Sequence, residues 1–207
     1  KFIFEFIMVP LQEALPPGGK LIYTEPGEAF FLWMKMAALA GLLLAMPILV
    51  SQIWMFIAPG LYTREKKWAI PFVALTSIFF LGGALFSHFV VFRLAWSFFA
   101  GFSTDYMDFM PKIAPVFSLY VKMMLAMGIV FQLPTLVFFL AKLGLVTPKF
   151  LIKNTKYAIL IIFIIAAVLT PSADPVTQTA MAAPMFVLYG ISIGIAWVFQ
   201  KSQPDDD

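Results

Sequence analysis

The sequence predicts an all-α membrane protein, a polytopic helical bundle that forms one transmembrane domain over residues 1–207. Hydrophobic residues make up 62% of the 207 residues and charged residues only 12%, and the mean hydropathy is +0.93. Soluble globular domains contain about 45–50% apolar residues. The apolar residues also fall into long runs, and a helix needs about 20 of them to cross a bilayer.

Five apolar segments are predicted to cross the membrane. Residues 1–9 are too short to do so and lack a signal-peptide cleavage site, so we interpret them as the end of a span or as an interfacial segment. Residues 10–28 are rich in proline and glycine and are expected to form a loop. The predicted spans are residues 29–57, 71–100, 114–141, 157–170 and 179–199, followed by a disordered tail at 201–207. One further span upstream would bring the total to six.

Several spans carry residues that shape a helix. Pro47 and Pro134 lie inside the first and third spans and are expected to kink them, because proline lacks an N–H group and its ring clashes with the preceding turn. Gly82 and Gly83 allow a close helix approach in the second span. The last two spans are predicted to be short, and the 14 residues of 157–170 would reach only about 21 Å. A short span thins the bilayer or draws interfacial residues inward.

Lysine and arginine residues predict the orientation. They are concentrated in the loops at 58–70 and 142–156, and another follows the last span, whereas the alternate loops have one or none. By the positive-inside rule, we place the two basic loops and the C-terminus in the cytoplasm.

The composition argues against several classes of function. A net charge of +3, confined to particular loops, does not suggest nucleic-acid binding. The chain has no cysteine and one histidine, so thiolate chemistry is excluded and no metal or cofactor site is expected. His88 with Ser87 or Ser77 is the one combination that resembles an intramembrane protease, but all three lie on one helix. We interpret His88 as a packing residue and expect no enzyme activity.

Three basic residues lie within predicted spans: Lys35, Arg93 and Lys122. All three are expected near the outer side, where long basic side chains can extend to the interface. No Asp or Glu lies in a span, which argues against a proton or sodium pathway.

Some polar residues leave two interpretations open. Gln132, deep in the third span, either bonds to a neighbouring helix or faces a cavity. Thr170, Asp174, Thr177 and Gln178 surround the last outer loop. They form either a capped turn at the start of the last helix or a functional site.

The loop between the first two spans contains four consecutive charged residues, Arg64 to Lys67. The topology explains the basic ones. Glu65 is either a solvated surface charge, which contributes little, or a docking site. A carboxylate at a membrane–water boundary can bind a guanidinium group through two hydrogen bonds, more strongly than in bulk water.

At this loop the sequence resembles the TatC family, the multi-spanning subunit of the twin-arginine protein translocase. The resemblance covers roughly residues 20–200 and depends on the order and spacing of five stretches: residues 22–31, 56–67, 131–134, 143–148 and 169–178. It implies a six-helix bundle that recognises paired arginines in the signal peptides of folded cargo. It also implies a location in the bacterial inner membrane, transport driven by the proton-motive force, TatA-like and TatB-like single-span partners, contact with the lipid bilayer and self-association.

The resemblance assigns roles to individual residues. The signal-binding patch would comprise Glu65 with Phe56, Leu61, Tyr62, Arg64 and Lys66. Gln132 would be the polar residue of the intramembrane face. Partner helices would contact Val168, Leu169, Thr170 and Gln178, and structural roles on the periplasmic side would fall to Pro26, Glu28 and Asp174.

The sequence departs from the family pattern in places. Many relatives have Glu where Gln132 stands, so a role requiring charge is not expected here. Gly190, His88 and Arg93 also differ from the residues usual in the family, and the family's N-terminal segment and first helix, with a second signal-binding acid, are absent from this sequence. The alternative function is a small-solute transporter or channel subunit, which requires paired polar groups near the midplane. A third possible function is that of a purely structural membrane scaffold.

Overall fold

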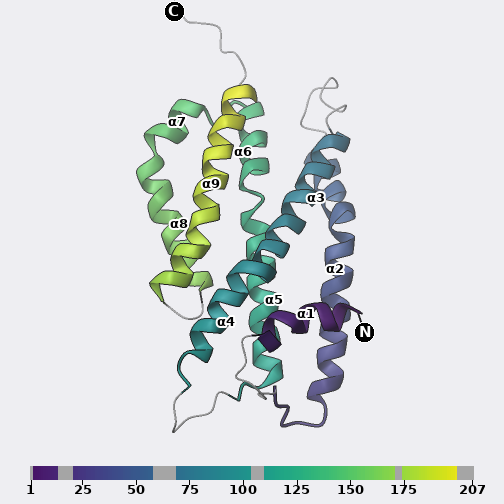
Figure 1. The fold of residues 1–207 in the computed structure, drawn as a ribbon. Coiled ribbons are helices and arrows are strands. Elements are labelled where there is room, and N and C mark those ends of the chain that lie inside the picture. Colours follow the sequence, from purple (N-terminus) through teal and green to yellow (C-terminus); the bar gives the residue numbers. More distant parts are fainter. Residues whose placement is uncertain (1, 14–20, 58–68, 104–109, 171–173, 200–207) are drawn as a thin grey trace, which may run out of the picture.

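A computed structural model describes residues 2–13, 21–57, 69–103, 110–170 and 174–199, and regular structure in these ranges is helical (Figure 1). The N-terminal half comprises α1 (Phe2–Glu13), α2 (Glu28–Ile57), α3 (Ala69–Phe86), the π-helix η3 (Ser87–Val91) and α4 (Phe92–Ala100). The C-terminal half comprises α5 (Ile113–Val130), α6 (Leu133–Lys142), α7 (Pro148–Lys153), α8 (Thr155–Leu169) and α9 (Pro175–Phe199). The fold class predicted from the sequence is confirmed.

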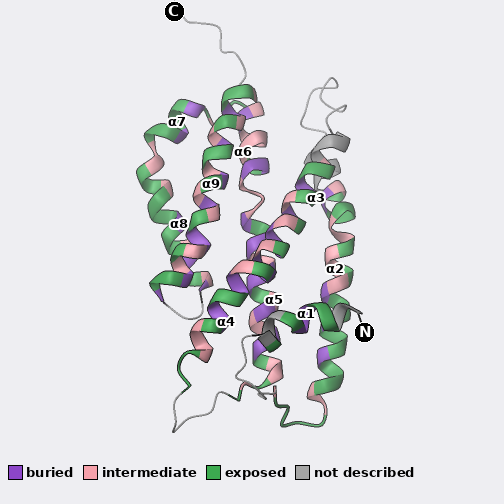
Figure 2. Cartoon of the chain, in the orientation of Figure 1, coloured by how far each residue is buried: buried purple, intermediate pink, exposed green. Residues whose placement is uncertain are grey.

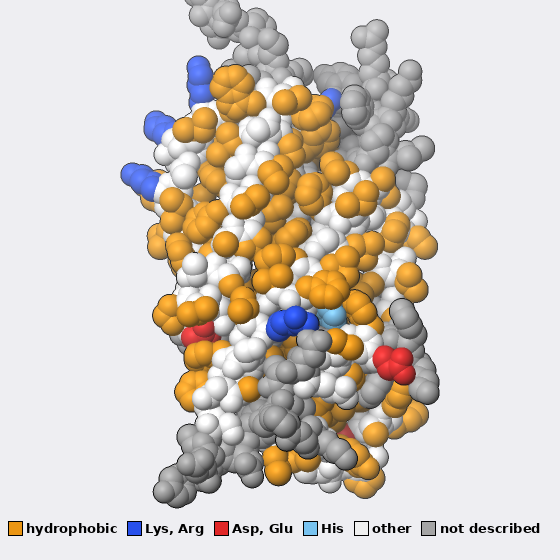
Figure 3. All heavy atoms as spheres, viewed as in Figure 1, with side chains coloured by type: hydrophobic (Ala, Val, Ile, Leu, Met, Phe, Trp, Pro, Cys, Tyr) orange, Lys and Arg blue, Asp and Glu red, His pale blue; other side chains and the backbone are white. Residues whose placement is uncertain are grey.

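Four helical segments in the described ranges are long and apolar enough to cross a membrane: Glu28–Gln52, Val73–Ala100, Ile113–Lys142 and Pro175–Phe199. Helix α8 is apolar but shorter. Figure 3 shows one face of the molecule as mainly hydrophobic, with lysine and arginine side chains gathered beside α7. The protein is therefore a multi-pass membrane protein.

Some predicted boundaries were wrong. Helix α9 begins at Pro175 rather than at residue 179, and its 25 residues span about 37 Å. Of the last two predicted spans, only α8 is short, with 15 residues and a length of about 22 Å. The predicted loop at 10–28 begins in α1, which continues to Glu13, and the predicted loop at 142–156 contains α7. The tail at 201–207 lies outside the described residues.

The two prolines inside predicted spans have different outcomes. Helix α2 continues through Pro47. The third span is interrupted as predicted, since α5 ends at Val130 and α6 begins at Leu133, with Pro134 in its first turn. The second span contains an irregularity that the sequence did not predict, the π-helix η3.

The core surrounds η3, which packs against α3, α4, α5 and α9, and residues of α1, α2 and α8 also belong to it (Figure 2). Val91, Phe92 and Ala95 are fully buried there. They pack with methionines of α5 and α9 such as Met127 and Met181, which are also fully buried. Methionine fills irregular gaps between helices because its side chain is flexible.

Helices α3 and α5 approach closely at two glycines. A Cβ atom on Gly83 would lie 2.5 Å from the carbonyl oxygen of Met127, and one on Gly128 would lie 2.7 Å from the ring of Phe80. Small residues at such crossings let helix backbones pack closely within a membrane. The close approach predicted at Gly83 is confirmed, whereas Gly82 faces open space.

We expect Gly83→Ala to lower stability by about 1–3 kcal/mol, because the added methyl group collides with backbone that cannot rotate away. Gly82→Ala is the matched control and should be neutral or slightly stabilising, since nothing lies within 4 Å of its Cβ position. Thermal unfolding of both variants in detergent would measure the difference. Equal melting temperatures would contradict the close approach.

Candidate functional site

The predicted signal-binding residues Leu61, Tyr62, Arg64, Glu65 and Lys66 lie outside the described residues. Phe56 lies in the last turn of α2, and its side chain is not among those described. The structure does describe the two ends from which this loop starts and returns, Ile57 of α2 and Ala69 of α3.

Both ends lie at the end of the bundle that also holds α7 and the last turn of α9 (Figure 1). We call it the basic end, because exposed Lys149, Lys153 and Lys156 occupy α7 and the start of α8. The loops with the most basic residues in the sequence therefore share one end of the molecule.

Gln132 lies at the break between α5 and α6. Its side-chain amide donates a hydrogen bond to the carbonyl oxygen of Thr76 in α3, with Nε2 and O 3.0 Å apart. This bond spans 56 positions of the sequence and ties the break to the second span. The first of the two interpretations, an interhelical hydrogen bond, is therefore realised.

Two buried polar atoms beside this bond, the Oε1 atom of Gln132 and the Oγ1 atom of Thr135, have no hydrogen-bond partner among the described residues. The residues belong to the same turn, and Thr135 is buried. Sequence reasoning did not identify Thr135, because a threonine in an apolar span usually bonds to its own helix.

Helix α8 packs against α9 and leaves most of its surface exposed (Figures 1 and 2). Of the four residues predicted to contact partner helices, Val168 is 79% exposed and Leu169 is partly buried. Thr170 is buried: its hydroxyl donates to the carbonyl oxygen of Ala166 at 2.6 Å and lies 3.1 Å from the sulfur of Met181. It therefore positions the end of α8 instead of presenting a contact surface.

The hairpin between α8 and α9 is fixed by two further hydrogen bonds. Gln178 donates from Nε2 to the carbonyl oxygen of Phe163, at 3.1 Å. Asp174 is buried, and its Oδ2 atom accepts a hydrogen bond from the backbone N–H of Thr177 at 2.6 Å, so Asp174 caps the start of α9. The capped turn left open by the sequence is thus present.

The segment before α2 is anchored by local hydrogen bonds. Glu28 accepts a hydrogen bond at Oε2 from the backbone N–H of Thr24, at 2.9 Å, and the exposed Pro26 lies in the turn between them. Ile22 also exchanges backbone hydrogen bonds with Pro111 and Ile113 at the start of α5.

His88 forms a cluster that the sequence did not reveal. Its Nδ1 atom lies 2.9 Å from the hydroxyl oxygen of Tyr120 in α5, and Phe6 of α1 stacks on its ring at 4.2 Å between centroids. The hydroxyl of Ser77 donates to the carbonyl oxygen of Val73 instead. His88 is therefore a packing residue that joins three helices, as the sequence analysis expected, and it pairs with a tyrosine instead of a serine.

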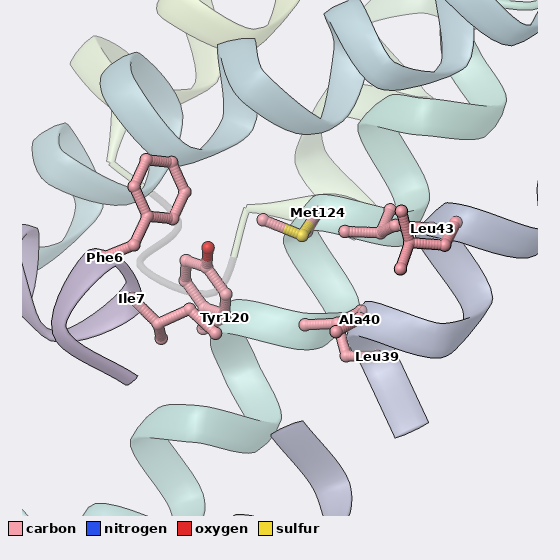
Figure 4. A pocket seen from close by; sticks show the side chains of 8 residues that line it. Phe6, Ile7, Leu39, Ala40, Leu43, Tyr120 and Met124 are labelled. Atoms are coloured by element: carbon pink, nitrogen blue, oxygen red, sulfur yellow. The ribbon is translucent and has the colours of Figure 1, made fainter. Parts of the chain in front are cut away.

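An apolar cavity of about 250 Å³ lies beside this cluster (Figure 4). It is lined by Phe6, Ile7, Leu39, Ala40, Leu43, Leu44, Tyr120 and Met124. Over the described ranges, no three His, Asp or Glu side chains are grouped as a metal site would require. Lys35, Arg93 and Lys122 are all exposed.

Comparison with known proteins identifies a family that this chain matches. The model of the family "Sec-independent protein translocase protein (TatC)" matches residues 1–184.

The chain belongs to the TatC family. It is 45% identical to a TatC of Desulforapulum autotrophicum over 205 residues, covering 99% of this chain and 76% of the relative. A TatC of Koribacter versatilis is 41% identical over 95% of this chain and 73% of its own.

The fold matches a crystal structure of the twin-arginine translocase receptor TatC. The TM-score is 0.78 and the sequence identity 34%, over 96% of this chain and 86% of the other. A second crystal structure of such a receptor, in the detergent DDM, has a TM-score of 0.79 at 34% identity, over 94% and 86% of the two chains. TatC family membership makes this protein a component of a protein translocase and favours protein transport over the solute-transporter alternative.

Proposed function

We propose that this protein is the signal-peptide receptor and core scaffold of a translocase that exports folded proteins with twin-arginine signals, driven by the proton-motive force. One observation carries the proposal: in a TatC-family fold, Ile57 of α2 and Ala69 of α3, the two described residues that flank the 58–68 loop, both lie at the basic end. The crystal structures that match this fold are described as receptors of the twin-arginine translocase.

Glu65 is the residue that we assign to arginine recognition. A carboxylate binds a guanidinium group through two parallel hydrogen bonds, and such charge-assisted bonds are short and strong. They gain strength at the membrane boundary because the effective dielectric constant is lower there. Phe56, Leu61 and Tyr62 would pack against apolar parts of the signal peptide, and Arg64 and Lys66 would complete the patch around Glu65.

The proposed location is the bacterial inner membrane, with the basic end in the cytoplasm. The exposed lysines of α7 and α8 lie at the same end as Ile57 and Ala69, the described residues on either side of the 58–68 loop, which supports one orientation for both loops by the positive-inside rule. A cytoplasmic loop is where a signal peptide on folded cargo is accessible before transport.

Helix α8 is the surface that we assign to single-span partners of the TatA and TatB type. Ile161, Ile164 and Val168 are all more than half exposed and recur at helical spacing along its outer side. On the opposite side, which faces α9, contacts of Thr170 and Gln178 hold α8 against α9. Leu169, partly buried at the end of α8, would complete the contact, and self-association of the receptor would use other apolar faces.

A short α8 also has a mechanical consequence. Its length of about 22 Å falls short of the hydrocarbon core of about 30 Å. The bilayer beside it is expected to thin, which lowers the barrier to moving a folded protein. Since α9 is long, the thinned region would lie on the α8 side alone.

We expect Glu65→Ala to weaken signal-peptide binding about 10-fold to 100-fold, because one charge-assisted pair contributes about 1.5–3 kcal/mol. Glu65→Lys should abolish binding by repelling the arginines. Site-specific crosslinking of a twin-arginine signal peptide to membrane-inserted protein measures this. Glu5→Gln, an exposed carboxylate on α1, is the control, and unchanged crosslinking in both Glu65 variants would refute the assignment.

We expect the insertion of one apolar turn (four residues) after Ile162 to reduce transport of folded cargo while leaving signal-peptide crosslinking intact. The longer α8 would approach the thickness of the hydrocarbon core and remove the thinning. A four-residue polar insertion after Gly144, in the turn between α6 and α7, is the control for added length. Transport at the wild-type rate would show that the length of α8 does not matter.

A further inference from the structure

A pocket with charges of both signs lies where α2 and α5 begin, at the opposite end of the bundle from the 58–68 loop. Its volume is about 380 Å³, and pockets for small ligands range over about 300–1,000 Å³. It is lined by Glu25, Gly27, Glu28, Phe31, Leu32, Lys35, Ala114 and Phe117.

The charges in this pocket are ordered by depth. Glu28 begins α2, and Lys35 follows seven residues later on the same face, about 10 Å farther along the helix. Glu25 precedes the helix. The backbone positions that carry the two carboxylates therefore lie nearer the rim than that of Lys35, which lies within the apolar span.

These charges are available to a ligand. Glu28 uses Oε2 to accept the hydrogen bond from the backbone N–H of Thr24, which leaves Oε1. Over the described parts of the chain, neither Glu25 nor Lys35 forms an ion pair, and both are exposed. A cation within a membrane span is costly unless an anion or water accompanies it.

We propose that this pocket binds the headgroup of a phospholipid that carries a primary amine beyond its phosphate, as in phosphatidylethanolamine. Such a lipid holds its phosphate next to the hydrocarbon and its amine farther out. Lys35 and the two glutamates have the same order, so the phosphate meets the ammonium of Lys35 and the amine meets the carboxylates.

The pair of acids selects the kind of lipid. A primary ammonium group has three N–H donors for carboxylate oxygens, whereas a choline group has none. A headgroup with net negative charge gains from Lys35 but is repelled by Glu25 and Glu28. Basic pockets between membrane helices typically bind acidic lipids. In this pocket, Glu25 and Glu28 disfavour an acidic headgroup.

The apolar cavity of Figure 4 gives the acyl chain a site on the same two helices. Leu39 follows Lys35 by four residues and Tyr120 follows Phe117 by three, so the cavity begins one turn deeper than the charged pocket. Apart from the hydroxyl of Tyr120, the side chains that line it are apolar. A charged pocket near the end of the bundle, with an apolar cavity one turn deeper, matches the headgroup and the acyl chain of a lipid.

The test is lipid binding to the full chain, purified in detergent. Phosphatidylethanolamine, phosphatidylcholine and phosphatidylglycerol with identical acyl chains are added separately. Native mass spectrometry measures the lipid bound to the protein, and thermal unfolding measures the change in melting temperature. We expect phosphatidylethanolamine to be retained most and to raise the melting temperature most. Lys35→Gln should reduce its affinity about tenfold, the loss expected for one charge-assisted contact.

Lys122→Gln removes an exposed lysine of α5 that does not line the pocket, and it should bind lipid as the wild type does. In the double variant Glu25→Gln with Glu28→Gln, phosphatidylglycerol should bind as well as phosphatidylethanolamine. The proposal is overturned if Lys35→Gln behaves like Lys122→Gln, or if the wild type prefers phosphatidylglycerol. It is also overturned if soluble glycerophosphoethanolamine gives the same stabilisation, since the ligand would then be a soluble phosphate ester.

Discussion

Pro134 has no backbone N–H to offer the carbonyl of Val130, and the third span breaks just before it, whereas α2 continues through Pro47. Helix α5 ends at Val130 and α6 begins at Leu133, and the two halves have different neighbours. Helix α5 packs chiefly on α3 and then on η3 and α2, whereas α6 packs chiefly on α9. Gln132 fixes the joint to α3 through its bond to the carbonyl oxygen of Thr76. The arrangement of the bundle depends on this joint.

The joint separates the two surfaces used by the proposed function. The 58–68 loop starts from α2 and returns into α3, on the α5 side of the break. Helix α8 rests on α9, which belongs to the α6 side. In the proposed function, a signal peptide bound at the loop would act on a partner helix at α8 through the contact of α3 with the break, or through η3, which packs against both α5 and α9. Gln132 needs no charge for this role, because its amide donates the hydrogen bond.

Hydropathy and proline placement predicted much of this fold. The apolar runs predicted the spans, Pro134 predicted the break between α5 and α6, and Gly83 predicted a close helix approach, which α3 and α5 make. The π-helix at Ser87–Val91 was not predictable, since it is stabilised by packing of His88 against Tyr120, 32 positions away. The start of α9 was placed too late although Asp174 and Pro175 are typical N-cap and first-turn residues. Of the candidate site, the hairpin contacts of Asp174 followed local capping rules, whereas Thr135 became notable only through its burial.

The role of the joint can be measured directly as a distance across it. The chain has no cysteine, so spin labels can be placed at Ile78→Cys on α3 and Val187→Cys on α9, both exposed positions. Pulsed electron paramagnetic resonance then compares the wild type with the variant Pro134→Ala and Gln132→Leu. We expect this variant to shift and broaden the distance distribution, because the third span can straighten and is no longer tied to Thr76. Pro115→Ala, in the exposed first turn of α5, should leave the distribution unchanged. A wild-type distribution in the Pro134 and Gln132 variant would show that the break does not set the arrangement of the bundle.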